Sequence, residues 1–410
     1  MSNGRLQITT YFNNIGFPMN NTNVRITPRF DRMNILEELI TDSSGRTPTI
    51  DLPTPPLEYS LETNLQKPYS EYDMIITKEG YDNTIIEGVQ ILPDCTAYQE
   101  VNLVQSANNQ LQTDSIIIND HTLWGNFPPK NYEEEVKPLP QATGYVVLPD
   151  PVIPEYVIVH DGAINDTTAK NYWISFKNYI KNVTSCEIYA TWPRETIKAN
   201  VLAIISFTLN RIYTEWYRGK GYDFTITSST AYDQAFSYGR NIYNEISSVV
   251  DEVFTTYITR PNILQPLLAQ YCDGKRVTCP NWMSQWGSKE LGDQGYNAIG
   301  ILRSFYGQEV YLSGATKVSG VPLSYLGTSL QEGSSGYPVR TIQEQLNAIS
   351  NNYPAIIKLR VDGIFGERTR TAVETFQEVF GIPATGIVDF STWYKISDIY
   401  VAVTRMGELN

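Results

Sequence analysis

The sequence is poor in positive charge, and this shortage narrows the range of possible partners. Its 410 residues include 31 Lys and Arg against 44 Asp and Glu, which gives a formal net charge of −13. No run of basic residues stands out along the chain. Because nucleic-acid binding relies on clustered Lys and Arg to neutralise phosphates, this composition argues against a nucleic-acid partner. An acidic surface is compatible with a sugar polymer, which aromatic and amide side chains recognise.

Long apolar runs are also missing. No stretch approaches the ~18 apolar residues that indicate a membrane-spanning helix, so we expect no membrane span. Residues 1–6 lack the basic and apolar regions of a secretory signal. This start predicts delivery by a route other than the general export pathway, or a chain from which the signal has been removed.

Histidine and cysteine are scarce, which limits metal chemistry. The chain has two His and four Cys, and Cys272 and Cys279 lie close together in sequence. They could form a disulfide, remain free thiols or bind zinc. No His lies between them, so a four-ligand zinc site would need ligands from elsewhere. We therefore favour a disulfide or free thiols, and predict no metal and no other cofactor.

The composition supports packed cores in two or three domains. Hydrophobic residues make up 41% of the chain and aromatic residues 12%, and its length suits domains of about 100–200 residues. In residues 1–104, Leu6 and Ile8 alternate with polar residues, as do Val24 and Ile26. We predict an all-β sandwich there. It resembles the transthyretin-like and carboxypeptidase-regulatory-like modules, which are structural or regulatory.

A polar segment that contains several prolines follows at residues 105–149. Prolines such as Pro138 and Pro140 keep the chain extended rather than helical. Exposed linkers of this kind are where proteases cut. The alternative is a passive spacer.

Residues 337–410 contain a short internal sequence repeat. Residues 362–369 are repeated in outline by residues 385–392, each with a glycine turn, an apolar pair and a polar residue before a helix. Between them, Ala372, Val373, Phe376 and Phe380 recur at helical spacing. The segment resembles the three-helix peptidoglycan-binding domain 1 family. Its signature lies mainly at core and turn positions, so the resemblance implies the fold more firmly than a binding site.

A single carboxyl group stands out in the central region, residues 150–330. Glu187 lies in a short apolar segment just ahead of a helix start, where Pro193 suits the first helical position. The apolar residues that follow predict an amphipathic helix with one buried face: Val201, Ile205, Leu209, Ile212 and Trp216. A carboxyl group buried against such a helix favours its protonated form, as a general acid requires. The alternative is a salt-bridged surface residue.

Two blocks of the central region resemble the SpoIID/LytB family of peptidoglycan lytic transglycosylases. The first is Glu187 a few residues before the pattern Pro-x-Glu-x-x-Lys-Ala, and the second is Ser284-Gln285-Trp286-Gly287. The resemblance covers roughly residues 150–312. It implies a central α+β catalytic domain, and with the flanking regions a multidomain α+β chain.

The same resemblance implies roles for individual residues. Glu187 would be the acid and base, Ser284 and Gln285 would hydrogen-bond the glycan, and Trp286 would stack on a sugar. Asp233 and Gln234 belong to a polar segment that resembles the substrate cleft of the family, although Ser228–Thr230 beside them could simply cap a helix. The chain departs from the family at residues 204–206, where Ile-Ile-Ser stands in place of Ala-Arg-Thr.

The domain order resembles that of the clostridial spore cortex-lytic enzymes. This resemblance implies a spore protein that acts on cortex peptidoglycan in germination. It implies a precursor in which residues 1–149 are removed by a Csp-type serine protease. Two alternatives remain: an N-acetylmuramoyl-L-alanine amidase, which two histidines make improbable because such enzymes use zinc, or a non-catalytic peptidoglycan-binding spore protein.

Overall fold

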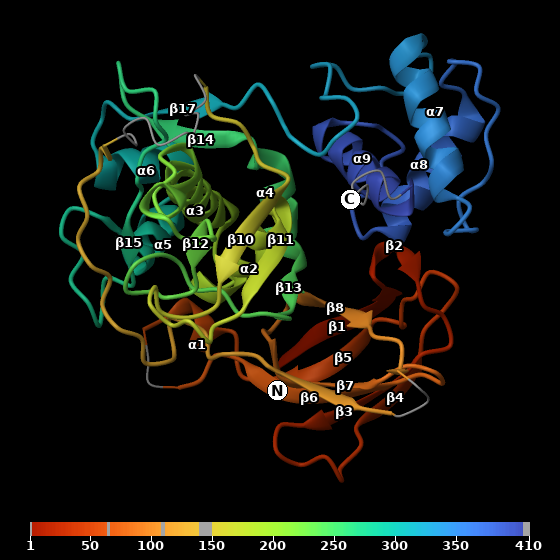
Figure 1. Cartoon of the computed structure of the whole chain (residues 1–410), viewed down its shortest axis with the longest axis horizontal. Coiled ribbons are helices and arrows are strands. Elements are labelled where there is room, and N and C mark those ends of the chain that lie inside the picture. Colours follow the sequence, from red (N-terminus) through yellow and green to blue (C-terminus); the bar gives the residue numbers. More distant parts are fainter. Residues whose placement is uncertain (1, 64–65, 108–110, 139–149, 405–410) are drawn as a thin grey trace.

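The computed structural model describes residues 2–63, 66–107, 111–138 and 150–404, and Figure 1 shows three bodies in chain order. A β-rich body comes first, drawn in red and orange. A mixed helix and strand body follows in yellow and green, and the last helices are blue. The chain is therefore a mixed α+β, multidomain protein, as the sequence predicts. No helix among the described residues is both long enough and apolar enough to span a membrane.

The first body is a pair of sheets that face one another, with one short helix. Its elements are β1 (Ser2–Phe12), β2 (Asn14–Pro18), β3 (Asn23–Pro28), β4 (Glu37–Ile40), β5 (Ile50–Thr54), α1 (Glu58–Leu61), β6 (Ser70–Thr77), β7 (Asn83–Ile91), β8 (Thr96–Leu103) and β9 (Thr113–Ile117). One sheet has the order β13-β8-β1-β2 with β5 also paired to β1, and the other has β4-β3-β6-β7-β9. Leu6, Ile8, Val24 and Ile26 are fully buried between them, which is the predicted alternation.

Both sheets take in a strand from outside residues 1–104. β9 belongs to the segment predicted as a linker, yet it pairs in parallel with β7. β13 belongs to the central body and pairs with β8, so that Ile242 lies opposite Tyr98 and Tyr243 opposite Ala97. The sandwich and the central body thus share a sheet. Part of the predicted linker, residues 139–149, lies outside the described residues.

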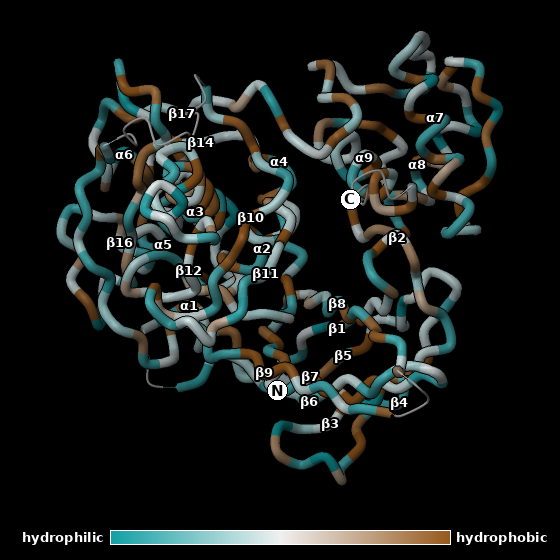
Figure 2. Tube along the Cα trace, in the orientation of Figure 1, coloured by the Kyte–Doolittle hydropathy of each residue, from teal (hydrophilic) through white to brown (hydrophobic). Residues whose placement is uncertain are grey.

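The central body is built around one helix. Its elements are β10 (Tyr156–His160), β11 (Asn171–Ser175), α2 (Phe176–Glu187), α3 (Arg194–Tyr213), a short 3₁₀ helix (Arg218–Lys220), β12 (Ile226–Thr227), β13 (Ile242–Tyr243), α4 (Asn244–Val253), β14 (Thr256–Thr259), β15 (Tyr271–Cys272), β16 (Met283–Ser284), α5 (Gln285–Asp293), α6 (Ala298–Tyr306) and β17 (Tyr311–Gly314). Helices α2, α4, α5 and α6 all contact α3. Figure 2 shows apolar residues, in brown, along α3 and along strands of the sandwich.

Helix α3 differs from its prediction in two respects. It is buried on nearly all sides rather than on one face, because other helices and β14 surround it. Pro193 is the residue before the first helical position, and Trp216 lies beyond the end at Tyr213. The periodic apolar residues identified the helix, but they understated how much of it the other elements cover.

The last body consists of three helices, as the sequence predicts: α7 (Tyr337–Ile349), α8 (Glu367–Val379) and α9 (Phe390–Thr404). Helices α7 and α9 pack together, and α9 also packs against β2 of the sandwich. Asn352 Nδ2 donates to the Gly16 carbonyl oxygen at 2.7 Å, and the Tyr353 hydroxyl donates to the Ile15 carbonyl. The sandwich therefore touches both other bodies.

Candidate functional site

Glu187 is the last residue of α2, ahead of the turn that leads into α3. Its side chain is buried, with a relative exposure of 5% for the residue. No described residue forms an ion pair with it within the 4.0 Å limit. The alternative of a salt-bridged surface residue is therefore wrong. Its burial agrees with the predicted packing of this residue ahead of the helix, and its role as a general acid stays a prediction.

Hydrogen-bond donors surround the Glu187 carboxylate. Oε1 accepts from the Ala235 backbone N–H at 2.9 Å and from the Tyr271 hydroxyl at 3.3 Å. Oε2 accepts from Gln285 Nε2 at 3.1 Å and from the Thr122 hydroxyl at 3.2 Å. Buried carboxyl groups need such partners because an unsatisfied one is costly. The donors fix both oxygens in place.

A cavity of about 200 Å³ opens beside this carboxylate. It is lined by Thr122, Asn126, Phe127, Pro128, Pro129, Lys130, Glu187, Thr230, Tyr271, Cys272, Asp273, Arg276, Val277 and Gln285. One wall is thus residues 122–130, and the other walls come from the central body. A segment that precedes the central body therefore forms part of the boundary of the space beside Glu187.

Segment 122–138, which we call the cover segment, is bound along its length. The Thr122 N–H donates to the Cys186 carbonyl at 3.0 Å, and the Asn131 N–H donates to the Ala231 carbonyl at 2.7 Å. Further along, Arg211 pairs with Glu133, and Arg260 pairs with Glu135 through two hydrogen bonds of 2.8 and 3.0 Å. Neither pair lines the cavity. They hold the part of the cover segment that follows its cavity-lining residues 122–130.

Lys130 carries a positive charge from the cover segment into the cavity. Its Nζ donates to the Asp233 carbonyl oxygen and lies 4.5 Å from the centre of the Tyr271 ring. Burial lowers the pKa of Lys130 to about 8, although the nearby Glu187 and Asp233 carboxylates act in the opposite direction.

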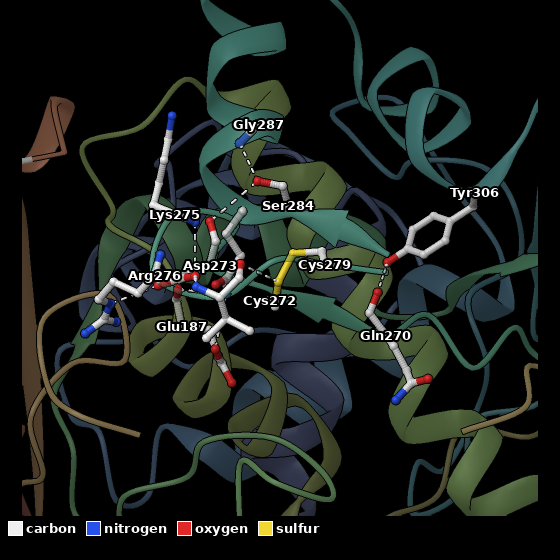
Figure 3. Close-up of a disulfide and its surroundings, with 12 residues drawn as sticks. Glu187, Gln270, Cys272, Asp273, Lys275, Arg276, Cys279, Ser284, Gly287 and Tyr306 are labelled. Carbon is white, nitrogen blue, oxygen red and sulfur yellow. Dashed lines mark hydrogen bonds and ion pairs between the residues drawn. A yellow bond between two sulfur atoms is a disulfide. The ribbon is translucent and has the colours of Figure 1, made fainter. Parts of the chain in front are cut away.

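A disulfide-closed loop also lines the cavity, through Cys272, Asp273, Arg276 and Val277. Figure 3 shows this disulfide and its surroundings, with Glu187 among the labelled residues. Cys272 and Cys279 are joined, with their Cα atoms 5.7 Å apart, so the disulfide alternative is confirmed. Within the loop, Asp273 pairs with Arg276 at 2.8 Å. Burial would raise the pKa of Asp273, but Arg276 and loop N–H donors outweigh it and hold that pKa below its ordinary value. Among the described residues, no three His, Cys, Asp or Glu side chains cluster as a metal site.

The predicted residues of the second block have different positions. Gln285 contacts Glu187, donating also to its backbone oxygen at 2.9 Å. Ser284 caps α5, where its hydroxyl accepts from the Gly287 N–H at 2.9 Å. Trp286 is 6% exposed and packs 5.0 Å from Trp192, outside the cavity lining. Only Gln285 is brought to the carboxylate, and the glycan contacts of all three stay predictions.

Asp233 and Gln234 are buried and do not line the cavity. Asp233 accepts from Arg211 Nε at 2.7 Å and from the Tyr217 hydroxyl at 2.6 Å. Gln234 accepts from the Tyr179 and Thr208 hydroxyls at 3.1 and 2.8 Å. These contacts place them in the framework behind the site. Their predicted contact with substrate is not tested by this arrangement.

A larger cavity of about 530 Å³ lies where the three bodies meet. Tyr98 of the sandwich, Phe236 of the central body and Phe380 of the last body are among its lining residues. Glu187 and the four groups that bind its carboxylate do not line it. We assign the candidate active site to the smaller cavity because it holds the buried carboxylate and its donors.

The site can perform acid–base chemistry with one carboxyl group. Two carboxylates line the cavity, Glu187 and Asp273. Asp273 is committed to Arg276 and to the N–H groups of Lys275 and Val277, at 3.1 and 3.0 Å. Glu187 has neutral donors and no arginine partner, so it is our candidate for the cavity carboxylate that exchanges a proton with a bound molecule.

Comparisons with known proteins bear on the last body. Residues 335–396 match a family model described as a putative peptidoglycan-binding domain. The zinc D-Ala-D-Ala carboxypeptidase of Streptomyces albus G is 41% identical over 69 residues, 17% of this chain and 26% of that protein. This chain thus spans about a quarter of that relative's length. The predicted C-terminal peptidoglycan-binding domain is confirmed, and the family match does not include Glu187.

Two solved structures show similarity over small parts of the chain. The SleB N-terminal domain is 30% identical, covering 19% of this chain and 99% of that one, with a TM-score of 0.17. A peptidoglycan-binding protein from Clostridioides difficile is 29% identical over 18% of this chain and 42% of that one, with a TM-score of 0.16.

Proposed function

We propose that this chain is the precursor of a lytic transglycosylase that cleaves spore cortex peptidoglycan in germination. The observation that carries the proposal is the buried Glu187, held by four donors in a cavity that the cover segment lines. The confirmed peptidoglycan-binding domain supports a cell-wall substrate. The domain order, similar to that of the clostridial enzyme SleC, supports a protein located in the spore outside its core.

The proposed reaction needs one carboxyl group in two roles. Glu187 first donates a proton to the glycosidic oxygen between N-acetylmuramic acid and N-acetylglucosamine, while positive charge develops at C1 of the muramic acid. The carboxylate then accepts the proton of the muramic C6 hydroxyl as that oxygen attacks C1. The products are a 1,6-anhydro-muramic end and a chain released at the glycosidic oxygen. The commitment of Asp273 to its own loop supports a mechanism with one carboxyl group rather than two.

The cover segment supports the proposal of a latent precursor. Thr122 bonds the Glu187 carboxylate, and residues 126–130 line the cavity where a glycan would bind. On this proposal a Csp-type serine protease cuts within residues 105–149, and the segment then leaves. Residues 139–149, one candidate region for the cut, lie outside the described residues.

Two other functions compete with this proposal. An N-acetylmuramoyl-L-alanine amidase would release stem peptides, and a non-catalytic spore protein would only bind peptidoglycan. The first usually depends on zinc, whereas Cys272 and Cys279 are joined to each other. A non-catalytic peptidoglycan-binding protein would not need the buried Glu187 for any reaction.

Mass spectrometry of digested cortex peptidoglycan tests the proposal. The full chain, cut at a protease site placed within residues 139–149, should release anhydro-muramic fragments. Glu187→Gln should lower the rate at least about a hundredfold, since a positioned acid contributes on that order or more. Asp223→Asn, an exposed change on the central body away from the cavity lining, is the matched control and should leave the rate unchanged. Reducing ends or free stem peptides would contradict the proposal.

A further inference from the structure

We infer that Arg276 is a substrate-binding residue of the activated enzyme, and that it binds amide carbonyl oxygens of the peptidoglycan beside Glu187. In the precursor it binds backbone carbonyl oxygens of the cover segment in their place. The inference rests on the proposed function and adds a contact that the site uses to recognise its glycan.

Arg276 is held in position before any substrate arrives. It lies in the loop between β15 and β16, which the Cys272–Cys279 disulfide closes. Its Nε donates to Asp273 Oδ2 at 2.8 Å, and its side chain is 46% exposed. The ion pair orients the guanidinium while leaving both terminal nitrogens free to bind other acceptors. A binding group fixed in this way loses little conformational entropy when a ligand binds.

Those terminal nitrogens now bind carbonyl oxygens of the cover segment. Nη2 donates to the Thr122 carbonyl, and Nη1 donates to the Gly125 carbonyl and to the Trp124 carbonyl at 3.3 Å. Thr122 also donates its hydroxyl to Glu187. Thr122 of the cover segment therefore accepts a hydrogen bond from Arg276 through its carbonyl oxygen and donates one to Glu187 through its hydroxyl group.

An acylated amino sugar offers the same two kinds of group. Its ring carbons carry hydroxyl groups, its ring and bridging oxygens are ether-type oxygens, and its N-acetyl group and lactyl amide carry carbonyl oxygens. When the cover segment leaves, the terminal nitrogens of Arg276 lose their carbonyl acceptors. A glycan whose oxygen reaches Glu187 would bring an amide carbonyl toward the vacated guanidinium.

The other arginines that hold the cover segment serve as a contrast. Arg211 is buried between Glu133 and Asp233, and Arg260 also donates to the Tyr306 carbonyl at 2.8 Å. Neither lines the cavity, whereas Arg276 does. Breaking the Arg260–Glu135 pair should loosen the cover segment without affecting glycan binding. Breaking the Arg276 contacts should do both.

Two measurements on the full chain separate these effects, each made in a Glu187→Gln background so that no glycan is consumed. In the uncut chain, Arg276→Met and Glu135→Ala should each make the cover segment several-fold more sensitive to an added protease. The chain is then cut within residues 139–149 and freed of its N-terminal fragment by size exclusion. Calorimetry with a disaccharide–peptide fragment of peptidoglycan should show about tenfold weaker binding for Arg276→Met and no change for Glu135→Ala.

A chemical variant of the ligand identifies the group that Arg276 binds. The N-deacetylated fragment should bind the Arg276 protein more weakly than the acetylated one, and Arg276→Met should reduce that difference. Arg276→Lys keeps the charge without the planar fork and should be intermediate. Unchanged glycan binding in Arg276→Met would overturn the inference, as would a loss that depends only on the peptide carboxylates. If the cut chain with its native Glu187 gave no anhydro products while binding still depended on Arg276, the proposed function alone would be overturned.

Discussion

At the scale of single residues, the site depends on contacts between distant parts of the sequence. Thr122 and Tyr271 bind the same carboxylate from positions 65 residues before it and 84 residues after it. The Ala235 N–H and Gln285 complete the shell. Each of these donors is a neutral group, and Glu187 also interacts electrostatically with the buried Lys130 of the cover segment. When the cover segment removes the Thr122 hydroxyl, the Ala235 N–H, Tyr271 and Gln285 can still hold the Glu187 carboxylate in place.

The buried Lys130 makes the stability of the folded chain depend on pH. Its pKa is lowered to about 8 in the folded chain, from an ordinary value of 10.5. Between these values the unfolded chain binds more protons than the folded one, so stability should rise with pH across this window. Below about pH 8 both states are protonated and the full cost of burying the charge is present.

Replacing Lys130 with Met tests this dependence. Lys130→Met should raise the melting temperature at pH 7, and the gain should shrink toward pH 10, as followed by intrinsic fluorescence. Lys317→Met, at an exposed lysine on the central body, is the control and should show no such trend. A gain in melting temperature that stayed constant with pH would contradict the lowered pKa of Lys130.

The sequence predicted some of these residues and missed others for a physical reason. Glu187 and Gln285 belong to local motifs, and the structure brings them into contact. Tyr271 and Arg276 lie in the cysteine segment, which drew attention only for its two cysteines, as a disulfide, free thiols or zinc ligands. Thr122 and Lys130 have no local signal at all, because their position depends on how a non-repetitive segment packs against a distant surface.

At the scale of elements, the packing of α5 on α3 positions Gln285. Asn200 Nδ2 on α3 donates to the Ser288 hydroxyl on α5 at 2.8 Å. The helices approach most closely at Gly292, where an added Cβ would lie 1.9 Å from the Thr196 hydroxyl oxygen. A glycine is therefore needed at this point of contact.

Gly292→Ala should push α5 away from α3 and move Gln285 relative to Glu187. We expect a loss of stability of about 1–3 kcal/mol, typical of overpacking a close contact, together with reduced activity of the cut chain. Thermal unfolding and the rate of fragment release measure the two effects. Gly314→Ala, where an added Cβ meets nothing within 4 Å, is the control. Equal behaviour of the two variants would show that the helix contact does not set the site.

Element type was easier to predict than element surroundings. The alternation at Leu6 and Ile8 and the spacing around Phe376 identified a strand and a helix, because one face of each is buried in its own body. The spacing in α3 could not show that other helices cover its remaining faces. The local pattern also could not show that β9 and β13 pair with strands of the sandwich, because strand pairing depends on residues far apart in the sequence.

At the scale of the whole molecule, the sandwich links the other two bodies. Besides the β13–β8 pairing, Asn241 Nδ2 donates to the Gln90 carbonyl at 2.8 Å, and the Tyr243 hydroxyl donates to the same oxygen at 2.9 Å. On the other side, β2 lies against α9 of the peptidoglycan-binding domain. A cut within residues 105–149 breaks the chain but not these contacts. Activation should therefore show a lag between cleavage and activity.

The contact between β2 and α9 can be broken at one position. An added Cβ on Gly16 would lie 2.6 Å from the Ala402 backbone, so Gly16→Ala should separate the sandwich from the peptidoglycan-binding domain. Small-angle scattering should then report a larger radius of gyration for the uncut chain. Gly366→Ala, with no atom within 4 Å of the added Cβ, should leave it unchanged. An unchanged radius in both variants would contradict a role for this contact.

The shared sheet also has a consequence for the discarded part of the chain. Once the sandwich leaves, β8 loses its pairing with β13 at Ala97 and Tyr98, which leaves the backbone groups of these residues unpaired on that edge. Such an edge is a template for pairing with another chain. The freed fragment should therefore self-associate as its concentration rises, which would keep it from returning to the enzyme and would make activation irreversible.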